Sequence, residues 1–310
     1  MRHTARWVVV AAWLVAISAC GGSEESDDAA TPQTETVPDT VRSTETPAST
    51  ADSDGSTTPV SPVTPGGPTA VEVTIDGRSL AGWCSGDSDE GSPTVVLSSG
   101  LGNRGSQLVS IETALKAESR VCSYDRAGLG GSDPAATPQT FTDVVDDLNT
   151  FLVQGHIDPP YVLVGHSMGG SIVIRYAQQH AADVAGFVAM NPIPPFTSWI
   201  ARASEVQSPE ELQSMEIDFY EGANDEGIDL RDTDLTIEEP VSDDIPYVVM
   251  YAEDCPGDFC DRIRPVLQAA TEEFASLGDR GKFIAVPGAG HDLYITNLDD
   301  ILTEVRALLG

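Results

Sequence analysis

The sequence is short of basic and aromatic side chains. Its 310 residues include 16 lysines and arginines against 49 aspartates and glutamates, which gives a formal net charge of −33. The only lysines are Lys116 and Lys282, and aromatic residues make up 6% of the chain. A nucleic-acid-binding protein needs a basic surface, so this balance argues against a nucleic-acid partner. It fits an acidic exported protein from a lysine-poor genome or from a high-salt habitat.

The N-terminus lacks an apolar run long enough to cross a bilayer. The run from Trp7 to Ile17 follows Arg2 and Arg6 and ends in small residues, as in an export signal. The last four residues of segment 1–20, "ISAC", resemble the lipobox of bacterial lipoproteins. This resemblance implies that Cys20 carries a diacylglycerol, which would anchor the protein to the outer face of the cytoplasmic membrane. An ordinary secretory signal that contains a cysteine is the alternative.

Residues 21–70 lack large apolar side chains and consist mostly of Ser, Thr, Pro, Asp, Glu and Gly. Such a segment cannot bury enough surface to offset the entropy of ordering. We therefore expect a disordered tether with a reach of roughly 40 Å. Residues 71–310 show no internal repeat and are enough for a single α/β domain with a sizeable core.

Cysteine is also scarce, with five residues in the chain. If Cys20 carries lipid, an even number remains in a compartment that permits disulfides. Cys255 and Cys260 enclose a short local loop, which leaves Cys84 to pair with Cys122. A zinc site is the competing interpretation, but the spacings do not match those of structural zinc sites. We therefore expect no metal.

The domain alternates between strand and helix patterns. A hairpin over residues 71–85 turns at Asp76–Gly77, and it precedes the alternating part. Strands are predicted at 94–99, 120–125, 161–165, 184–190, 247–252 and 282–286, and helices at 106–117, 141–154, 168–180, 263–277 and 298–309. This order predicts an α/β fold, with a mostly parallel sheet covered by helices on both faces and the hairpin at its edge.

The third of these strands and the helix that follows it meet at "GHSMG", residues 165–169. This segment satisfies the G-x-S-x-G pattern. The pattern indicates a nucleophilic serine when a strand precedes it and a helix follows it, as is predicted here. The two glycines leave room for a strained turn that exposes Ser167. The helix N-terminus behind Ser167 adds a positive partial charge where an oxyanion would develop. We interpret Ser167 as a nucleophile.

A serine nucleophile needs a base, and the sequence has five histidines. His291 lies in the glycine-rich segment "VPGAGHDLY", between the last strand and the last helix, where it can reach over Ser167. We expect the side chain of His166 to point away from the nucleophile because of the turn that it occupies. The remaining histidines lie in the signal peptide, in a loop and at a helix end: His3, His156 and His180.

The acid that orients the base is expected after the strand 247–252. The segment "AEDCPGDFC" offers Glu253, Asp254 and Asp258, and Asp254 suits a loop at a strand end best. Asp258 and Glu253 remain alternatives. A disulfide between Cys255 and Cys260 would stiffen this loop.

Five segments together resemble the serine hydrolases of the α/β-hydrolase fold: "VVLSSGLGNRG", "YDRAGLGGSDP", "VLVGHSMGG", "YAED" and "GAGHD". The resemblance covers residues 71–310. It implies an oxyanion hole formed by the backbone N–H groups of Leu101 and Met168, with Ser99 where many relatives have histidine. It also implies that Asp125 and Arg126 brace their loop and take no part in catalysis.

The resemblance implies acyl transfer through Ser167, His291 and Asp254 without a cofactor. It also places a cap at residues 192–246, which is rich in Asp and Glu. Such a cap disfavours a lipase that works at an oil surface and an enzyme that acts on anionic substrates. We therefore expect a neutral small or medium ester as the substrate. We also expect a monomeric enzyme that is anchored to the membrane by lipid. Amides, peptides, thioesters and perhydrolysis remain open. A non-catalytic envelope lipoprotein that uses the fold as a binding module is the alternative from another class.

Overall fold

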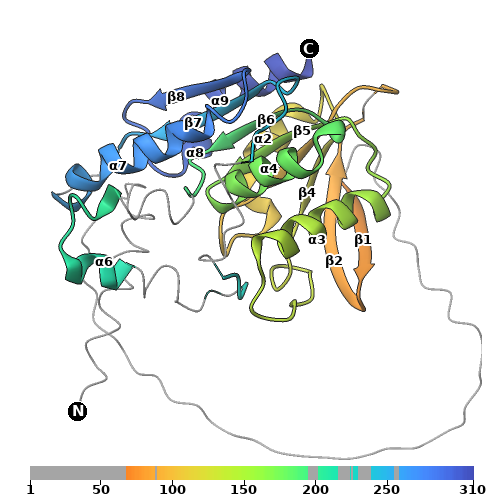
Figure 1. Cartoon of the computed structure of the whole chain (residues 1–310). Coiled ribbons are helices and arrows are strands. Elements are labelled where there is room, and N and C mark those ends of the chain that lie inside the picture. The colour runs from red at the N-terminus through yellow and green to blue at the C-terminus, as the bar shows by residue number, and fades with distance from the viewer. Residues whose placement is uncertain are drawn as a thin grey trace, which may run out of the picture. The chain divides into compact units, whose positions relative to one another are not determined.

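The computed structural model of the chain describes residues 68–87, 89–194, 202–215, 224, 226–229, 239–254 and 258–310. Its eight-stranded sheet has the order β1-β2-β4-β3-β5-β6-β7-β8 (Figure 1). The strands are β1 Thr69–Ile75, β2 Arg78–Ser85, β3 Thr94–Ser98, β4 Val121–Tyr124, β5 Tyr161–His166, β6 Val184–Met190, β7 Tyr247–Ala252 and β8 Gly281–Val286. The predicted signal peptide with Cys20, and the tether up to residue 67, lie outside the described residues.

A hairpin forms the antiparallel edge of the sheet. β1 and β2 pair antiparallel and turn at Asp76 and Gly77, which both have positive φ, as a tight two-residue hairpin turn requires. β2 also pairs antiparallel with β4, so that Cys84 faces Cys122. These two cysteines form a disulfide. Cys255, and the side chain of Cys260, lie outside the described part of the chain, so the second bridge stays a prediction.

The other strands pair parallel and are covered on both faces. Along β5, Tyr161 and Leu163 belong to one core cluster, whereas Val162 and Val164 belong to the other. This is why the strand reads as a continuous apolar run. The first cluster includes residues of α3 Phe141–Gln154, α4 Met168–Gln179 and α7 Asp258–Phe274. The second includes residues of α2 Val109–Leu115, α8 Leu293–Thr296 and α9 Leu298–Leu309.

The helices differ from the predicted ones at a few ends. Residues 106–117 divide into a 3₁₀ turn, η1 Gly105–Leu108, and the helix α2. α7 begins at Asp258, five residues before the predicted start, and Phe259, four residues before Ile263, continues the apolar spacing of the helix. Asp258, an alternative to Asp254 as the predicted acid, is thus the first residue of a helix. The short elements η2 Ala181–Asp183, α6 Pro209–Met215 and α8 were not predicted.

The segment between β6 and β7, residues 192–246, is called the insert below. It corresponds to the predicted cap and is described at 192–194, 202–215, 224, 226–229 and 239–246. α6 lies in it. Within the described parts of the chain, no helix is both long and apolar enough to span a membrane.

Candidate active site

Ser167 lies in a strained turn between β5 and α4. Its φ of 54° and ψ of −121° are unusual for a residue with a side chain. The turn is tight enough to exclude side chains at its glycines: a Cβ on Gly165 would lie 2.1 Å from the Gly169 carbonyl oxygen, and one on Gly169 would lie 2.0 Å from that of Ser98. The flanking residues His166 and Met168 are buried, whereas Ser167 is partly exposed. The turn therefore presents the serine.

Backbone donors surround this turn. Met168 is the first residue of α4, so its N–H lies among the helix N–H groups that have no partner within the helix. The loop after β3, residues 99–102, lies nearby, since a Cβ on Gly100 would be 3.5 Å from Ser167 Cβ. We call residues 99–102 the oxyanion loop. Gly100 N–H donates to Gln107 Oε1 at 2.7 Å and Gly102 N–H donates to Glu226 Oε1 at 2.7 Å. In the sequence, Leu101 lies between these two glycines.

His291 lies in the turn that follows β8. Ala289 N–H in this turn donates to the carbonyl of Val286, and its own carbonyl accepts from Asp254 N–H at 2.9 Å. The end of β7 therefore fixes the turn that carries His291. This matches the sequence argument that functional groups gather at the carboxyl ends of parallel strands.

His166 joins the His291 turn to the nucleophile turn. Its Nε2 lies 2.9 Å from the His291 carbonyl oxygen, and the two imidazole rings are 4.7 Å apart between centroids. A carbonyl only accepts, so Nε2 of His166 carries the proton. The expectation that this side chain points away from the site is wrong, because the turn directs it against the loop of the base. Burial lowers the pKa of His166, which keeps the ring neutral.

Asn191 holds the His291 ring and was missed from the sequence. It directly follows β6, has a φ of 49°, and its Nδ2 lies 2.7 Å from His291 Nδ1. Its Oδ1 accepts from Ala252 N–H at 3.1 Å. A backbone N–H can only donate, so the amide is oriented with its NH₂ group toward His291. The signal in the sequence was an asparagine at the carboxyl end of a parallel strand.

These contacts assign the tautomer of His291. Because Nδ1 accepts from Asn191, the ring proton lies on Nε2. Burial, and to a lesser degree the nearby His166, lower the pKa of His291 to about 3. The imidazole is therefore neutral over the physiological range and carries its proton on the nitrogen opposite Asn191.

The three candidate acids have different environments. Asp254 follows the end of β7 and is exposed. Its backbone N–H donates to the Ala289 carbonyl in the His291 turn. Glu253 precedes Asp254 and donates its N–H to the Val286 carbonyl. Asp258 begins α7. The role of Asp254 as the acid stays a prediction.

His166 and two residues of the His291 turn could together hold a metal ion. His166, His291 and Asp292 offer ligand atoms within 4.8 Å of one another. However, Nε2 of His166 already donates to a carbonyl, and a metal on His291 would occupy the ring that the sequence predicts as the base. We assign no metal to this cluster.

Comparisons with known proteins agree with this architecture. A family model described as the alpha/beta hydrolase fold matches residues 93–235. The putative carbamate hydrolase RutD of Yersinia enterocolitica is 35% identical over 125 residues, which are 40% of this chain and 44% of that protein. The matched segments span less than half of the length of the first curated relatives.

Solved structures show the same likeness over more of the chain. The enol-lactonase from Burkholderia xenovorans LB400 has a TM-score of 0.57 and 19% identity, and the match covers 77% of this chain and 99% of that one. The proline iminopeptidase of Mycobacterium smegmatis has a TM-score of 0.60 and 15% identity, over 78% and 97% of the two chains. The sheet topology and these similarities agree, and the chain has the α/β-hydrolase fold.

Proposed function

We propose that the protein is a serine hydrolase that cleaves a neutral small or medium ester through an acyl-enzyme. Ser167 is the nucleophile, His291 the base and Asp254 the acid that assists it. Leu101 and Met168 supply the N–H groups of the oxyanion hole. The reaction needs no metal or organic cofactor.

The observation that carries this proposal is the strained turn on Ser167. A non-glycine residue with a φ of 54° costs free energy, which proteins accept at functional sites. The turn combines an accessible hydroxyl with a helix N-terminus, and His166 packs it against the loop of His291. Nucleophile, base loop and backbone donors therefore meet at one end of the sheet, as acyl transfer requires.

The chemical step requires a change of tautomer in His291. Nε2 can take the Ser167 proton only after the ring proton has moved to Nδ1. Nδ1–H then needs an acceptor, which is either the Asp254 carboxylate or the Oδ1 of Asn191 after rotation of its amide. The charged ring that forms as Ser167 attacks is stabilised by the same acceptor and gives its proton to the departing alcohol, which leaves the acyl group on Ser167. The neutral ring then takes a proton from water, which attacks the acyl-enzyme, and returns that proton to Ser167 as the acid leaves.

The charge of the insert guides the choice of substrate. From residue 198 to residue 244 it carries 15 acidic residues against two arginines. Two of these acids, Glu226 and Glu239, form ion pairs with Arg126 and Arg175. The remaining negative charge would repel anionic substrates. The names of the relatives, which include a carbamate hydrolase and an enol-lactonase, support hydrolysis at a carbonyl without selecting the substrate.

We also propose that the enzyme is attached to the outer face of the cytoplasmic membrane through a lipid on Cys20. The support is the "ISAC" segment and the polar stretch of residues 21–70 that follows it. Growth with a radioactive or alkyne-bearing fatty acid tests this. Label should enter the wild-type protein and not the Cys20→Ala variant, and equal labelling of both would overturn the assignment.

A fluorophosphonate probe tests the catalytic proposal directly. The protein should be labelled at neutral pH, and labelling should vanish in Ser167→Ala. Failure of the folded wild-type protein to react would refute the proposal. A panel of p-nitrophenyl esters then measures chain length, and a preference for long acyl chains would contradict the interpretation of the insert.

One observation favours a second candidate, a non-catalytic binding module of the envelope. The tautomer of His291 in this structure, with the proton on Nε2, is the one that cannot accept a proton from Ser167. A binding module would keep this tautomer throughout the neutral range and would not react with the probe. The same labelling experiment separates the two candidates.

A further inference from the structure

Arg126 lies under the oxyanion loop and is held by it on one side. Its Nη1 donates to the Ser99 carbonyl at 2.6 Å, and its Nη2 donates to the Gly100 carbonyl at 2.6 Å. The side chain is 3% exposed. A buried guanidinium needs a counter-charge, since an unpaired one costs several kcal/mol.

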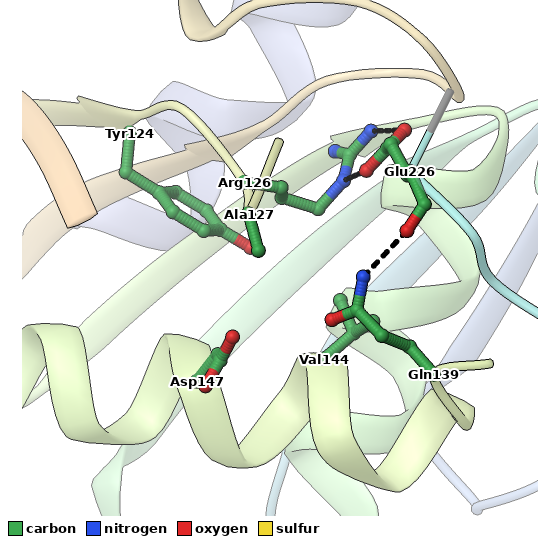
Figure 2. A pocket seen from close by; sticks show the side chains of 7 residues that line it. All are labelled: Tyr124, Arg126, Ala127, Gln139, Val144, Asp147 and Glu226. Carbon is green, nitrogen blue, oxygen red and sulfur yellow. Dashed lines mark hydrogen bonds and ion pairs between the residues drawn. The ribbon is translucent and has the colours of Figure 1, made fainter. Parts of the chain in front are cut away.

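Glu226 of the insert supplies this counter-charge. Figure 2 shows its carboxylate facing the guanidinium of Arg126, and the two distances are 2.6 Å from Nε to Oε2 and 2.8 Å from Nη2 to Oε1. The Glu226 side chain is 1% exposed. Its Oε1 also accepts from Gly102 N–H at 2.7 Å. The ion pair thus binds two carbonyls and one N–H of the four-residue oxyanion loop.

Glu226 is itself fixed to the body of the domain. Gln139 Nε2 donates to the Glu226 carbonyl at 2.6 Å, as Figure 2 shows, and the backbone of Gln139 pairs with Gly227 and Asp229. A local turn adds rigidity, because Asn224 Oδ1 accepts from Ile228 N–H at 3.0 Å. Hydrogen bonds to the domain body therefore fix the conformation of this part of the insert.

We infer that Arg126 and Glu226 are positioning residues that hold the oxyanion loop in its catalytic shape and so couple the insert to the oxyanion hole. The inference rests on the proposed function. With the Gly100 and Gly102 N–H groups both occupied, the Leu101 N–H is the donor that this bracing leaves for the substrate. An oxyanion donor acts in the transition state, so misplacing it lowers kcat and leaves KM nearly unchanged.

The test compares the fluorophosphonate labelling rate and the ester kinetics of the full-length wild type with those of two variants. Glu226→Gln keeps the shape of the side chain but leaves the Arg126 charge unpaired. The double variant Arg126→Met with Glu226→Gln removes both charges, which relieves the buried unpaired charge. Both should still be labelled at Ser167. The rate should fall about 10- to 100-fold, somewhat less than the 10²- to 10³-fold loss on removing an oxyanion donor outright.

Glu239→Gln is the matched control. Glu239 also pairs with a buried arginine of the domain body, Arg175, but this pair does not touch the oxyanion loop. Its labelling rate should stay within about twofold of the wild type. Thermal unfolding of each variant accompanies the kinetics, so that a loss of folded protein is not counted as a loss of rate.

The outcomes separate the inference from the proposed function. If the double variant regains both thermal stability and the wild-type labelling rate, the pair is only a structural ion pair and the inference is overturned. A rise in KM with unchanged kcat would also overturn it, since the pair would then act on substrate binding. If the wild-type protein itself does not react, the proposed function fails and the inference falls with it.

Discussion

Replacing Asn191 by aspartate should change the tautomer of His291. In the native protein Asn191 Nδ2 donates to Nδ1 of the ring, and Oδ1 is held by Ala252 N–H. A carboxylate of the same shape can accept from Ala252 N–H with one oxygen. With the other it can accept from Nδ1–H of His291. The ring proton would then lie on Nδ1 and leave Nε2 free as the base.

The size of the effect follows from the distance. The Asn191 amide nitrogen lies 2.7 Å from Nδ1, so the centres of charge in the aspartate variant would be about 4 Å apart. At an effective dielectric constant of about 20, two unit charges at this distance interact by about 4 kcal/mol. This corresponds to about three pKa units. The pKa of His291, which is about 3 in the native site, should therefore rise to near 6.

Two measurements check this prediction. In protein labelled with ¹⁵N-histidine, NMR should detect the Nε2–H tautomer of His291 in the native chain and the Nδ1–H tautomer in Asn191→Asp. The acid limb of kcat/KM for a p-nitrophenyl ester should appear near pH 6 in the variant and at far lower pH in the native protein, at about the His291 pKa. Asn191→Ala, which removes the amide without adding charge, is the control. Detection of the Nδ1–H tautomer in the native protein would refute the reasoning.

Acid should destabilise the protein, because His291 has a folded pKa of about 3 and an unfolded pKa of about 6.5, so the unfolded chain binds more protons between these values. At about pH 4.5 this group alone should lower the free energy of unfolding by about 2 to 3 kcal/mol. Urea unfolding at neutral pH and at about pH 4.5 should show that acid lowers the free energy of unfolding less in His291→Asn than in the wild type. An equal decrease in both proteins would contradict the assignment. Replacing Cys84 and Cys122 by serine opens a disulfide with a sequence separation of 38 and should cost about 4 kcal/mol by loop entropy. A decrease of less than about 1 kcal/mol in the free energy of unfolding, measured with urea, would contradict this prediction. Gly165→Ala places a methyl group 2.1 Å from the Gly169 carbonyl oxygen and should cost at least about 2 kcal/mol, and a native-like melting temperature would disprove the tight turn.

The sequence alone determined the fold class and the elements that carry the site. Buried parallel strands are apolar throughout, so β3, β5, β6 and β7 were visible as short continuous runs. The turn at Ser167 was visible because a strand pattern gives way to a helix pattern within a few residues and small residues flank it. Such signals are local, and a local pattern is what a single sequence reports reliably.

Tertiary structure decided which side chains meet. Nothing near Asn191 in sequence indicates that it contacts a histidine 100 residues later, and nothing near Glu226 indicates a partner in Arg126. These pairs depend on the positions of β4, β6 and β8 in the sheet and on where the insert returns to it. A hydrogen bond between distant segments leaves no periodic trace in either one. Residue types and turns therefore follow from the sequence, whereas the tautomer of the base and the support of the oxyanion loop follow only from the packed domain.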